Sequence, residues 1–141
     1  MNKTISLVLV IVIIIAGGYF LLKNKKVEAP AATTGVETRN TVIYTDAGYE
    51  PGTLTVKLGE TVAWKNESSS GMWTASGVHP SHTLYSGTSL SEHCLDVSGT
   101  AFDACGSTQP GDSWSFTFNK TGTWKYHNHL KASHLGTIVV E

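Results

Sequence analysis

Histidine is the residue type in this chain whose spacing most favours chemistry. Five of the six His lie in two short stretches, His79-Pro80-Ser81-His82 and His127-Asn128-His129 with His134 close behind. Neutral imidazoles bind zinc, nickel, iron and, most tightly among the divalent first-row ions, copper. On an extended strand His127 and His129 point to the same side, opposite to Asn128, so both could reach one ion. The sixth, His93, is predicted to be a surface residue outside any site.

The two cysteines offer either a disulfide or one thiolate ligand. Cys94 and Cys105 enclose the segment LDVSGTAFDA, and a bridge around a loop of this size contributes roughly 2–3 kcal/mol. We predict the disulfide, with a metal thiolate as the alternative. No nucleophile elbow, carboxylate pair or phosphate-binding glycine loop accompanies the histidines, so the sequence favours a binding protein over an enzyme and leaves the question open. Its net charge of −1 argues against nucleic-acid binding.

The segments that must position these residues are short strands. From Thr41 onward, β-branched and aromatic runs alternate with turn residues every eight to twelve positions, which is typical of an all-β sandwich. Leu54, Val56 and Leu58 alternate with polar residues, which predicts one apolar and one wet face. The predicted strands are Thr41–Thr45, Thr53–Leu58, Glu60–Asn66, Thr83–Tyr85, Ser113–Asn119, Thr123–His127 and Thr137–Glu141.

The order of these segments resembles the cupredoxin family over nearly all of residues 40–141. GYEPGTLTVKLGETVAWKN at 48–66 looks like the first half of that family, and PGDSWSFTF at 110–118 followed by GTWKYH at 122–127 looks like its second half. GTIVV at 136–140 is similar to its last strand. The resemblance implies an all-β, Greek-key cupredoxin-like sandwich with a copper site at one end.

The chain departs from that family at the copper site. Blue-copper members carry a Cys at the end of the strand, after the Tyr that corresponds to Tyr126. A His follows three residues later, and a Met stands shortly before the final Gly. Asn128, Lys131 and His134 stand at those positions, so the thiolate that makes copper blue and fast in electron transfer is missing. Met72 is a weaker candidate for an axial ligand, and Trp73 is expected to serve packing.

The histidine motifs themselves resemble those of multicopper oxidase domains, which use His-Pro-x-His and His-x-His. On that resemblance His82, His127 and His129 face one copper centre, while His79 and His134 mark the place of the missing blue site. Copper is the predicted ion, with zinc as the alternative. The predicted metal ligands are therefore His79, His82, His127, His129 and His134.

The N-terminal residues predict a membrane anchor. Residues 5–22 are almost wholly apolar, between Lys3 and the lysines at 23, 25 and 26, and such a run is just long enough to cross a bilayer. A cleaved signal peptide is the alternative, although its apolar core is usually shorter. We expect residues 1–26 to form this anchor, 27–40 a flexible linker and 41–141 the cupredoxin-like domain.

The location of the domain rests on two opposing signals. The lysine distribution alone would place the domain inside the cell, whereas the cysteine pair and the metal chemistry favour an oxidising exterior. We predict a membrane-anchored domain in the periplasm or outside the cell. Three functions follow: copper binding for storage or delivery, electron transfer with a protein partner, or a subunit of an oligomeric copper oxidase or reductase.

Overall fold

The computed structural model describes residues 40–95 and 98–141. The predicted anchor and all but the last residue of the predicted linker lie outside this part of the chain. Among the residues that are described, no helix is both long enough and apolar enough to cross a bilayer.

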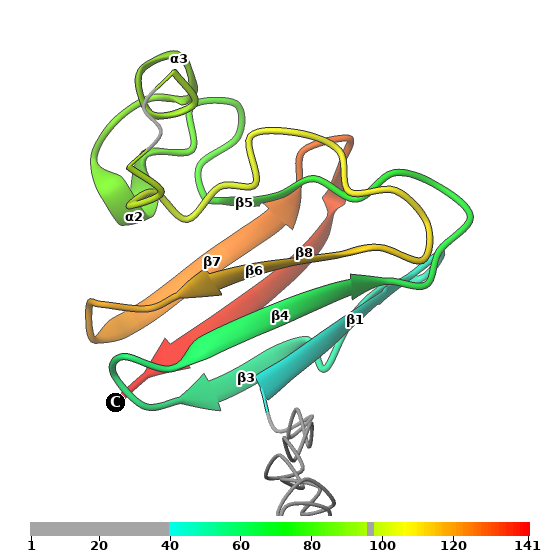
Figure 1. The fold of residues 1–141 in the computed structure, drawn as a ribbon, viewed down its shortest axis with the longest axis horizontal. Coiled ribbons are helices and arrows are strands. Elements are labelled where there is room, and N and C mark those ends of the chain that lie inside the picture. The colour runs from blue at the N-terminus through cyan, green and yellow to red at the C-terminus, as the bar shows by residue number, and fades with distance from the viewer. Residues whose placement is uncertain (1–39, 96–97) are drawn as a thin grey trace, which may run out of the picture. The chain divides into compact units, whose positions relative to one another are not determined.

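Two four-stranded sheets pack face to face (Figure 1). One has the order β2-β1-β4-β6 and the other β3-β8-β7-β5. β1 runs parallel to β4 and β3 parallel to β8, whereas the other pairs are antiparallel. The all-β sandwich predicted from the sequence is confirmed. The strands of the first sheet are β1 (Thr41–Thr45), β2 (Gly48–Glu50), β4 (Thr61–Asn66) and β6 (Ser113–Thr117), and those of the second are β3 (Thr53–Val56), β5 (Thr74–Ser76), β7 (Gly122–Asn128) and β8 (Lys131–Val140).

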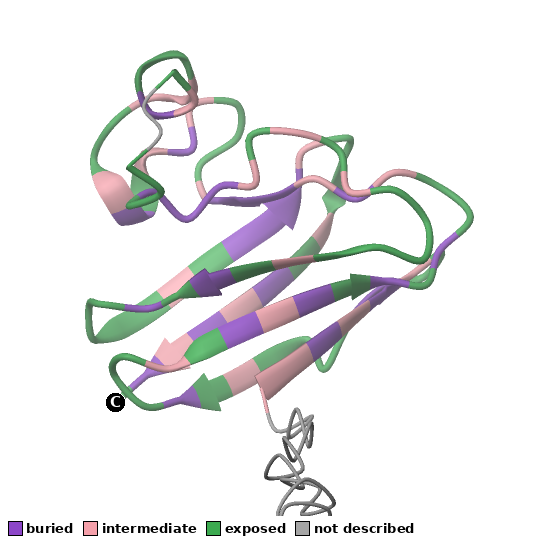
Figure 2. Cartoon of the chain, viewed as in Figure 1, coloured by how far each residue is buried: buried purple, intermediate pink, exposed green. Residues whose placement is uncertain are grey.

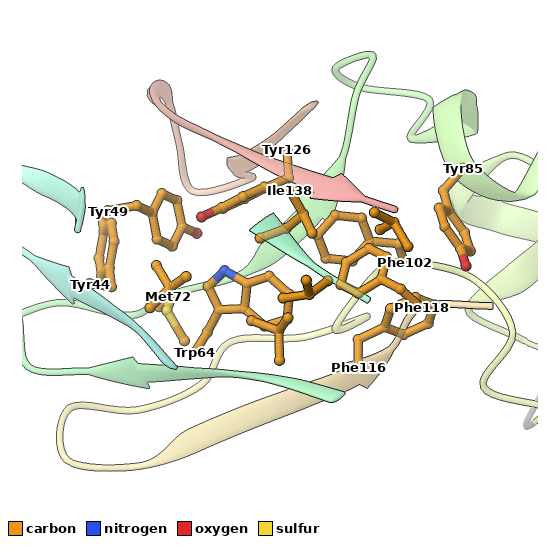
Figure 3. Close-up of a cluster of buried hydrophobic side chains, with 14 residues drawn as sticks. Tyr44, Tyr49, Trp64, Met72, Tyr85, Phe102, Phe116, Phe118, Tyr126 and Ile138 are labelled. Carbon is orange, nitrogen blue, oxygen red and sulfur yellow. The ribbon is translucent and has the colours of Figure 1, made fainter. Parts of the chain in front are cut away.

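Period-two alternation explains which side chains fill the space between the sheets. Along β4, buried residues alternate with more exposed ones (Figure 2). Val62 and Trp64 are wholly buried. Trp64 lies at the centre of an aromatic cluster, with ring centroids 5.2 Å from Phe102 and 5.5 Å from Tyr126 (Figure 3). Large aromatic rings therefore supply most of the apolar contact that joins the sheets.

A long connection between β5 and β6 covers the side of the sandwich where those two strands lie. It carries two short helices, α2 (Thr83–Ser86) and α3 (Leu90–His93). Tyr85 on α2 is buried against the rings of Phe116, Phe118 and Trp124, so this connection completes the core beside β6 and β7.

The predicted strand Thr83–Tyr85 is wrong, because this segment is the helical turn α2. His82 has a left-handed backbone, with φ at 59°, and the Leu84 N–H donates to the Gly77 carbonyl 2.6 Å away. These features curl the chain back on itself, so Tyr85 points inward while Leu84 is exposed.

Smaller differences concern the ends of strands and strands that were not predicted. β2 and β5 have three residues each, too few for alternation to show. β8 begins at Lys131 rather than at the predicted Thr137, and Leu58 lies beyond β3 with its side chain exposed. Gly136 pairs with Tyr126 across β7 and β8, and a Cβ at Gly136 would collide with the Tyr126 ring. Only glycine fits there.

Candidate metal centre

The two faces of β7 carry different chemistry. Tyr126 points into the core, and Asn128 reaches the same interior, where its Nδ2 donates to the Tyr44 hydroxyl at 2.8 Å. Alternation then places His127 on the outer face of the second sheet. His129 follows in the turn between Asn128 and Lys131, and its ring also lies on that side, 6.4 Å from the His127 ring.

The neighbours of His127 in the sheet fix the position of the site. Ala75 of β5 is paired with His127, and on its other side Ala75 forms a bridge with Asp103. Residues paired across adjacent strands lie on the same face of a sheet. The candidate site therefore lies on the outer face of the second sheet, at its β5 edge.

His79 and His82 reach this face from the start of the β5–β6 connection. The His82 N–H donates to the Val78 carbonyl at 2.7 Å, and the Ser76 hydroxyl donates to the His82 carbonyl at 2.8 Å. His82 is wholly buried, whereas His79 is exposed. A left-handed residue other than glycine is uncommon, although His is among the types enriched there. The backbone at His82 is therefore held in a less favourable conformation that aims its ring at β7.

Four imidazoles meet at this point. One nitrogen from each of His79, His82, His127 and His129 lies within 4.8 Å of the others. His79 Nδ1 is 3.2 Å from His127 Nε2, and His82 Nε2 is 2.9 Å from His129 Nδ1. Four nitrogens bound to one ion at about 2.0–2.1 Å in tetrahedral geometry would be roughly 3.3 Å apart. The four side chains thus fit a first-row metal ion with little movement.

A buried carboxylate lies directly behind the cluster. Asp103 Oδ2 is 2.5 Å from His82 Nδ1 and 3.0 Å from His93 Nε2. Asp103 Oδ1 accepts hydrogen bonds from Trp73 Nε1 and the Cys105 N–H, each at 2.7 Å. Burial alone would raise the pKa of Asp103, but these four hydrogen bonds outweigh it and hold that pKa at about 2. Asp103 is therefore a carboxylate at any physiological pH.

The surroundings of the cluster favour the neutral form of two of its imidazoles, His127 and His129. Burial, followed by the neighbouring His82, His79 and His129, lowers the pKa of His127 to about 4, and Asp103 opposes this only in part. Burial and two histidine neighbours also lower the pKa of His129. Metal ions bind the neutral form of imidazole, so His127 and His129 are in the binding form at neutral pH.

His134 lies apart from these four residues, on the interior side of β7. Its Nδ1 is 3.0 Å from the Tyr44 hydroxyl, which also accepts the hydrogen bond from Asn128. Asn128, at the position of the family's Cys, is buried and uses its amide structurally: Oδ1 accepts from the Trp73 and Leu130 N–H groups, and Nδ2 also approaches the Gly71 carbonyl. The structure thus brings together four of the five predicted ligands and leaves His134 outside the cluster.

Of the remaining sequence predictions, the disulfide is confirmed and the exposed position of His93 is wrong. Cys94 and Cys105 form the predicted disulfide, so neither thiol is available as a ligand. Met72 is fully buried in the core. The prediction that His93 is a surface residue is wrong: it is buried because its ring reaches inward to Asp103.

Three residues that support the site were not predicted from the sequence to do so. Trp73 not only packs, with its ring centroid 4.4 Å from that of His129, but also donates to Asp103. Asp103 and His93 could have been found from the cysteines. A bridge between Cys94 and Cys105 brings nearby residues together, and His93 and Asp103 lie one and two residues before these cysteines.

Comparison with known proteins identifies the fold. No family model and no curated protein matches the sequence. Among solved structures, the chain is similar to a purple cupredoxin from Nitrosopumilus maritimus, with 20% identity, a TM-score of 0.53 and coverage of 72% of this chain and 98% of that one. It is also similar to a reduced mutant of amicyanin, with 23% identity, a TM-score of 0.54 and coverage of 74% and 84%. The described part of the chain is therefore a domain with the cupredoxin fold.

Proposed function

We propose that this protein binds one copper ion in the four-histidine cluster and holds or delivers that copper outside the cytoplasm. The observation that carries the proposal is the convergence of four ring nitrogens within 4.8 Å on one face of a cupredoxin-type sheet. The solved structures of similar fold include a Cu(I) form of amicyanin, which supports copper as the ion. Copper also heads the affinity order for nitrogen ligands.

The ligand set favours binding over catalysis. Four protein ligands complete a tetrahedral shell, whereas catalytic metal sites keep a position open for water or substrate. Both cysteines are in the disulfide and Asn128 faces the interior, so no thiolate is available to give a blue site. One exposed ligand, His79, gives the ion a route in and out. These features suit a protein that stores copper or passes it on.

Electron transfer is the second candidate, and the surface around His79 favours it. Val78, Leu84, Leu130 and Leu135 are each 42–66% exposed, and all four lie next to the cluster in sequence or across a strand. One shallow apolar hollow is lined by three of these residues, Val78, Leu84 and Leu135, together with His79 and His127. Exposed apolar surface of this kind suits a protein partner, either a redox protein or an acceptor of copper.

The proposed location follows from the sequence and the disulfide. A bridge between Cys94 and Cys105 fits an oxidising compartment, and residues 1–26 would tether the domain to the membrane. The partner would then be another protein at the membrane surface or in the same compartment.

Metal analysis of the full chain tests the proposal. We would purify it in mild detergent from cells supplied with copper or with zinc, and measure metal content and the electron paramagnetic resonance spectrum of the oxidised copper form. We expect one copper per chain and the wide hyperfine splitting of nitrogen ligation. Absence of bound copper, or an intense blue colour, would overturn the assignment.

A matched pair of variants locates the ion. His82→Asn removes the imidazole yet keeps a residue that tolerates the left-handed backbone, so loss of copper would not reflect backbone strain. Asn119→Ala alters an exposed turn residue and should bind copper like the parent protein. Reversible oxidation and reduction of the bound copper, at rates that match a protein partner, would favour electron transfer over storage.

A further inference from the structure

The buried carboxylate of Asp103 has four nitrogen groups within hydrogen-bond distance. Its side chain has no exposed surface, and each carboxylate oxygen faces two N–H groups. Oδ1 faces the Trp73 indole and the Cys105 backbone, and Oδ2 faces the two imidazoles of His82 and His93. An indole and a backbone amide can only donate, so Oδ1 must accept from both.

The hydrogen bond to Oδ2 determines where His82 carries its proton. A carboxylate oxygen can only accept, so His82 Nδ1 must carry the hydrogen. In neutral imidazole the other nitrogen, Nε2, then has a free lone pair. That Nε2 is the atom that faces His129 Nδ1 at 2.9 Å inside the cluster. The carboxylate therefore turns the metal-binding lone pair of His82 toward the ion.

The carboxylate is itself held from two sides. His93 lies one residue before Cys94, and Asp103 lies two residues before Cys105, so the disulfide ties together the two segments that carry them. His93 Nε2 contacts Oδ2 at 3.0 Å, while its Nδ1 lies 3.1 Å from the Thr88 carbonyl and 3.2 Å from the Thr88 hydroxyl, so both ring nitrogens are held. Asp103 thus has little freedom to turn away from His82.

We propose that Asp103 is a positioning residue of the metal site, which fixes His82 in the tautomer that binds the ion, and that His93 and the Cys94–Cys105 disulfide hold the carboxylate for this task. This inference rests on the proposed copper-binding function. Carboxylates that orient metal-binding imidazoles in this way typically contribute 10–100-fold to metal affinity.

Asp103→Asn provides the test because it changes the chemistry with almost no change of shape. The Asn oxygen can still accept from Trp73 and Cys105, but its NH₂ group would then face His82 Nδ1 and force that atom to accept. The hydrogen of His82 would move to Nε2 and point into the cluster. We expect copper affinity, measured in the full chain by competition with a chelator, to fall 10–100-fold.

Asp112→Asn is the matched control, since it removes the same charge from an exposed turn before β6. It should bind copper within about 3-fold of the parent protein on the general scale for unpaired surface residues. Absence of copper in the parent protein would refute the proposed function itself. Copper binding by the parent together with unchanged affinity in Asp103→Asn would refute only the role of Asp103.

A second measurement keeps the inference testable if Asp103→Asn does not fold. Nitrogen-15 NMR of the metal-free parent protein reports which nitrogen of each neutral imidazole carries hydrogen. We expect His82 to carry it on Nδ1. A hydrogen on Nε2 in the metal-free protein would overturn the proposal, whatever the affinity of the variant.

Discussion

Asn128→Ala should destabilise the domain while leaving its copper content unchanged. Asn128 is 1% exposed and accepts hydrogen bonds from the Trp73 N–H at 2.9 Å and the Leu130 N–H at 3.0 Å. Alanine leaves both backbone donors without this acceptor, and a buried donor without a partner costs about 1–3 kcal/mol. Because Leu130 lies at the surface, water can replace its bond in part. The expected loss of unfolding free energy is therefore about 2–4 kcal/mol.

Thermal unfolding of the metal-free full chain, followed by circular dichroism, measures this loss. For a domain of about 100 residues each kcal/mol shifts the Tm by about 4–8 °C, so the Tm should fall by at least about 8 °C. Asn119→Ala on the exposed turn is the control and should melt like the parent protein. Below its Tm, the Asn128→Ala protein should still bind one copper per chain, because the amide faces away from the four imidazoles. An unchanged Tm, or a folded variant without copper, would refute this division between the two faces of β7.

Four further outcomes follow from the site. Copper at about a thousand times its Kd should stabilise the folded domain by about 4 kcal/mol and raise the Tm by roughly 20 °C, and a Tm indifferent to copper would count against a specific site. In the metal-free protein the pKa of His127 is about 4 in the folded state and near its ordinary value of 6.5 in the unfolded state. Urea titrations should therefore show its full contribution to stability above pH 6.5 and a loss toward pH 4 of up to about 1.4 kcal/mol per pH unit. Equal stability at pH 4.5 and pH 7 would contradict the lowered pKa. The contribution of Asp103, whose folded pKa is about 2, should persist above its ordinary value of 3.8 and disappear only as the pH falls through 2. Replacing His79, His127 or His129 by Ala should each weaken copper binding, whereas His134→Ala should leave it intact, and loss of copper in the His134 variant would place that residue back in the site.

The sequence predicted well those parts of the fold where alternation is long enough to be seen. Val62 and Trp64 on β4, and Trp114 and Phe116 on β6, lie where period two places them. Alternation was misleading at Thr83–Tyr85, because an alternating three-residue pattern also describes one helical turn with a single inward ring. β5 escaped because all three of its residues, Thr74, Ala75 and Ser76, are buried and show no alternation.

The resemblance to multicopper oxidase domains predicted that His82 lies beside His127 and His129, but it did not predict that His79 joins the same cluster. His127 and His129 do lie on one side and Asn128 on the other, although His129 follows the end of β7 and is not part of the strand. What the sequence does not reveal is that the β5–β6 connection folds against the outer face of β7, which brings His79 and His82 to those residues and leaves His134 behind. That arrangement depends on the burial of Tyr85 and Phe102 and on the disulfide, which are long-range contacts.

The position of the four imidazoles outside the sandwich has a consequence for protein engineering. Two of the ligands, the supporting carboxylate and the disulfide all belong to one continuous segment, residues 77–105, and the other two ligands belong to a His-x-His motif at the end of β7. The metal centre is therefore a transferable module. Grafting that segment between the matching strands of another cupredoxin, with His-x-His written at the end of its equivalent of β7, would carry all four imidazoles and the supporting carboxylate to a new host.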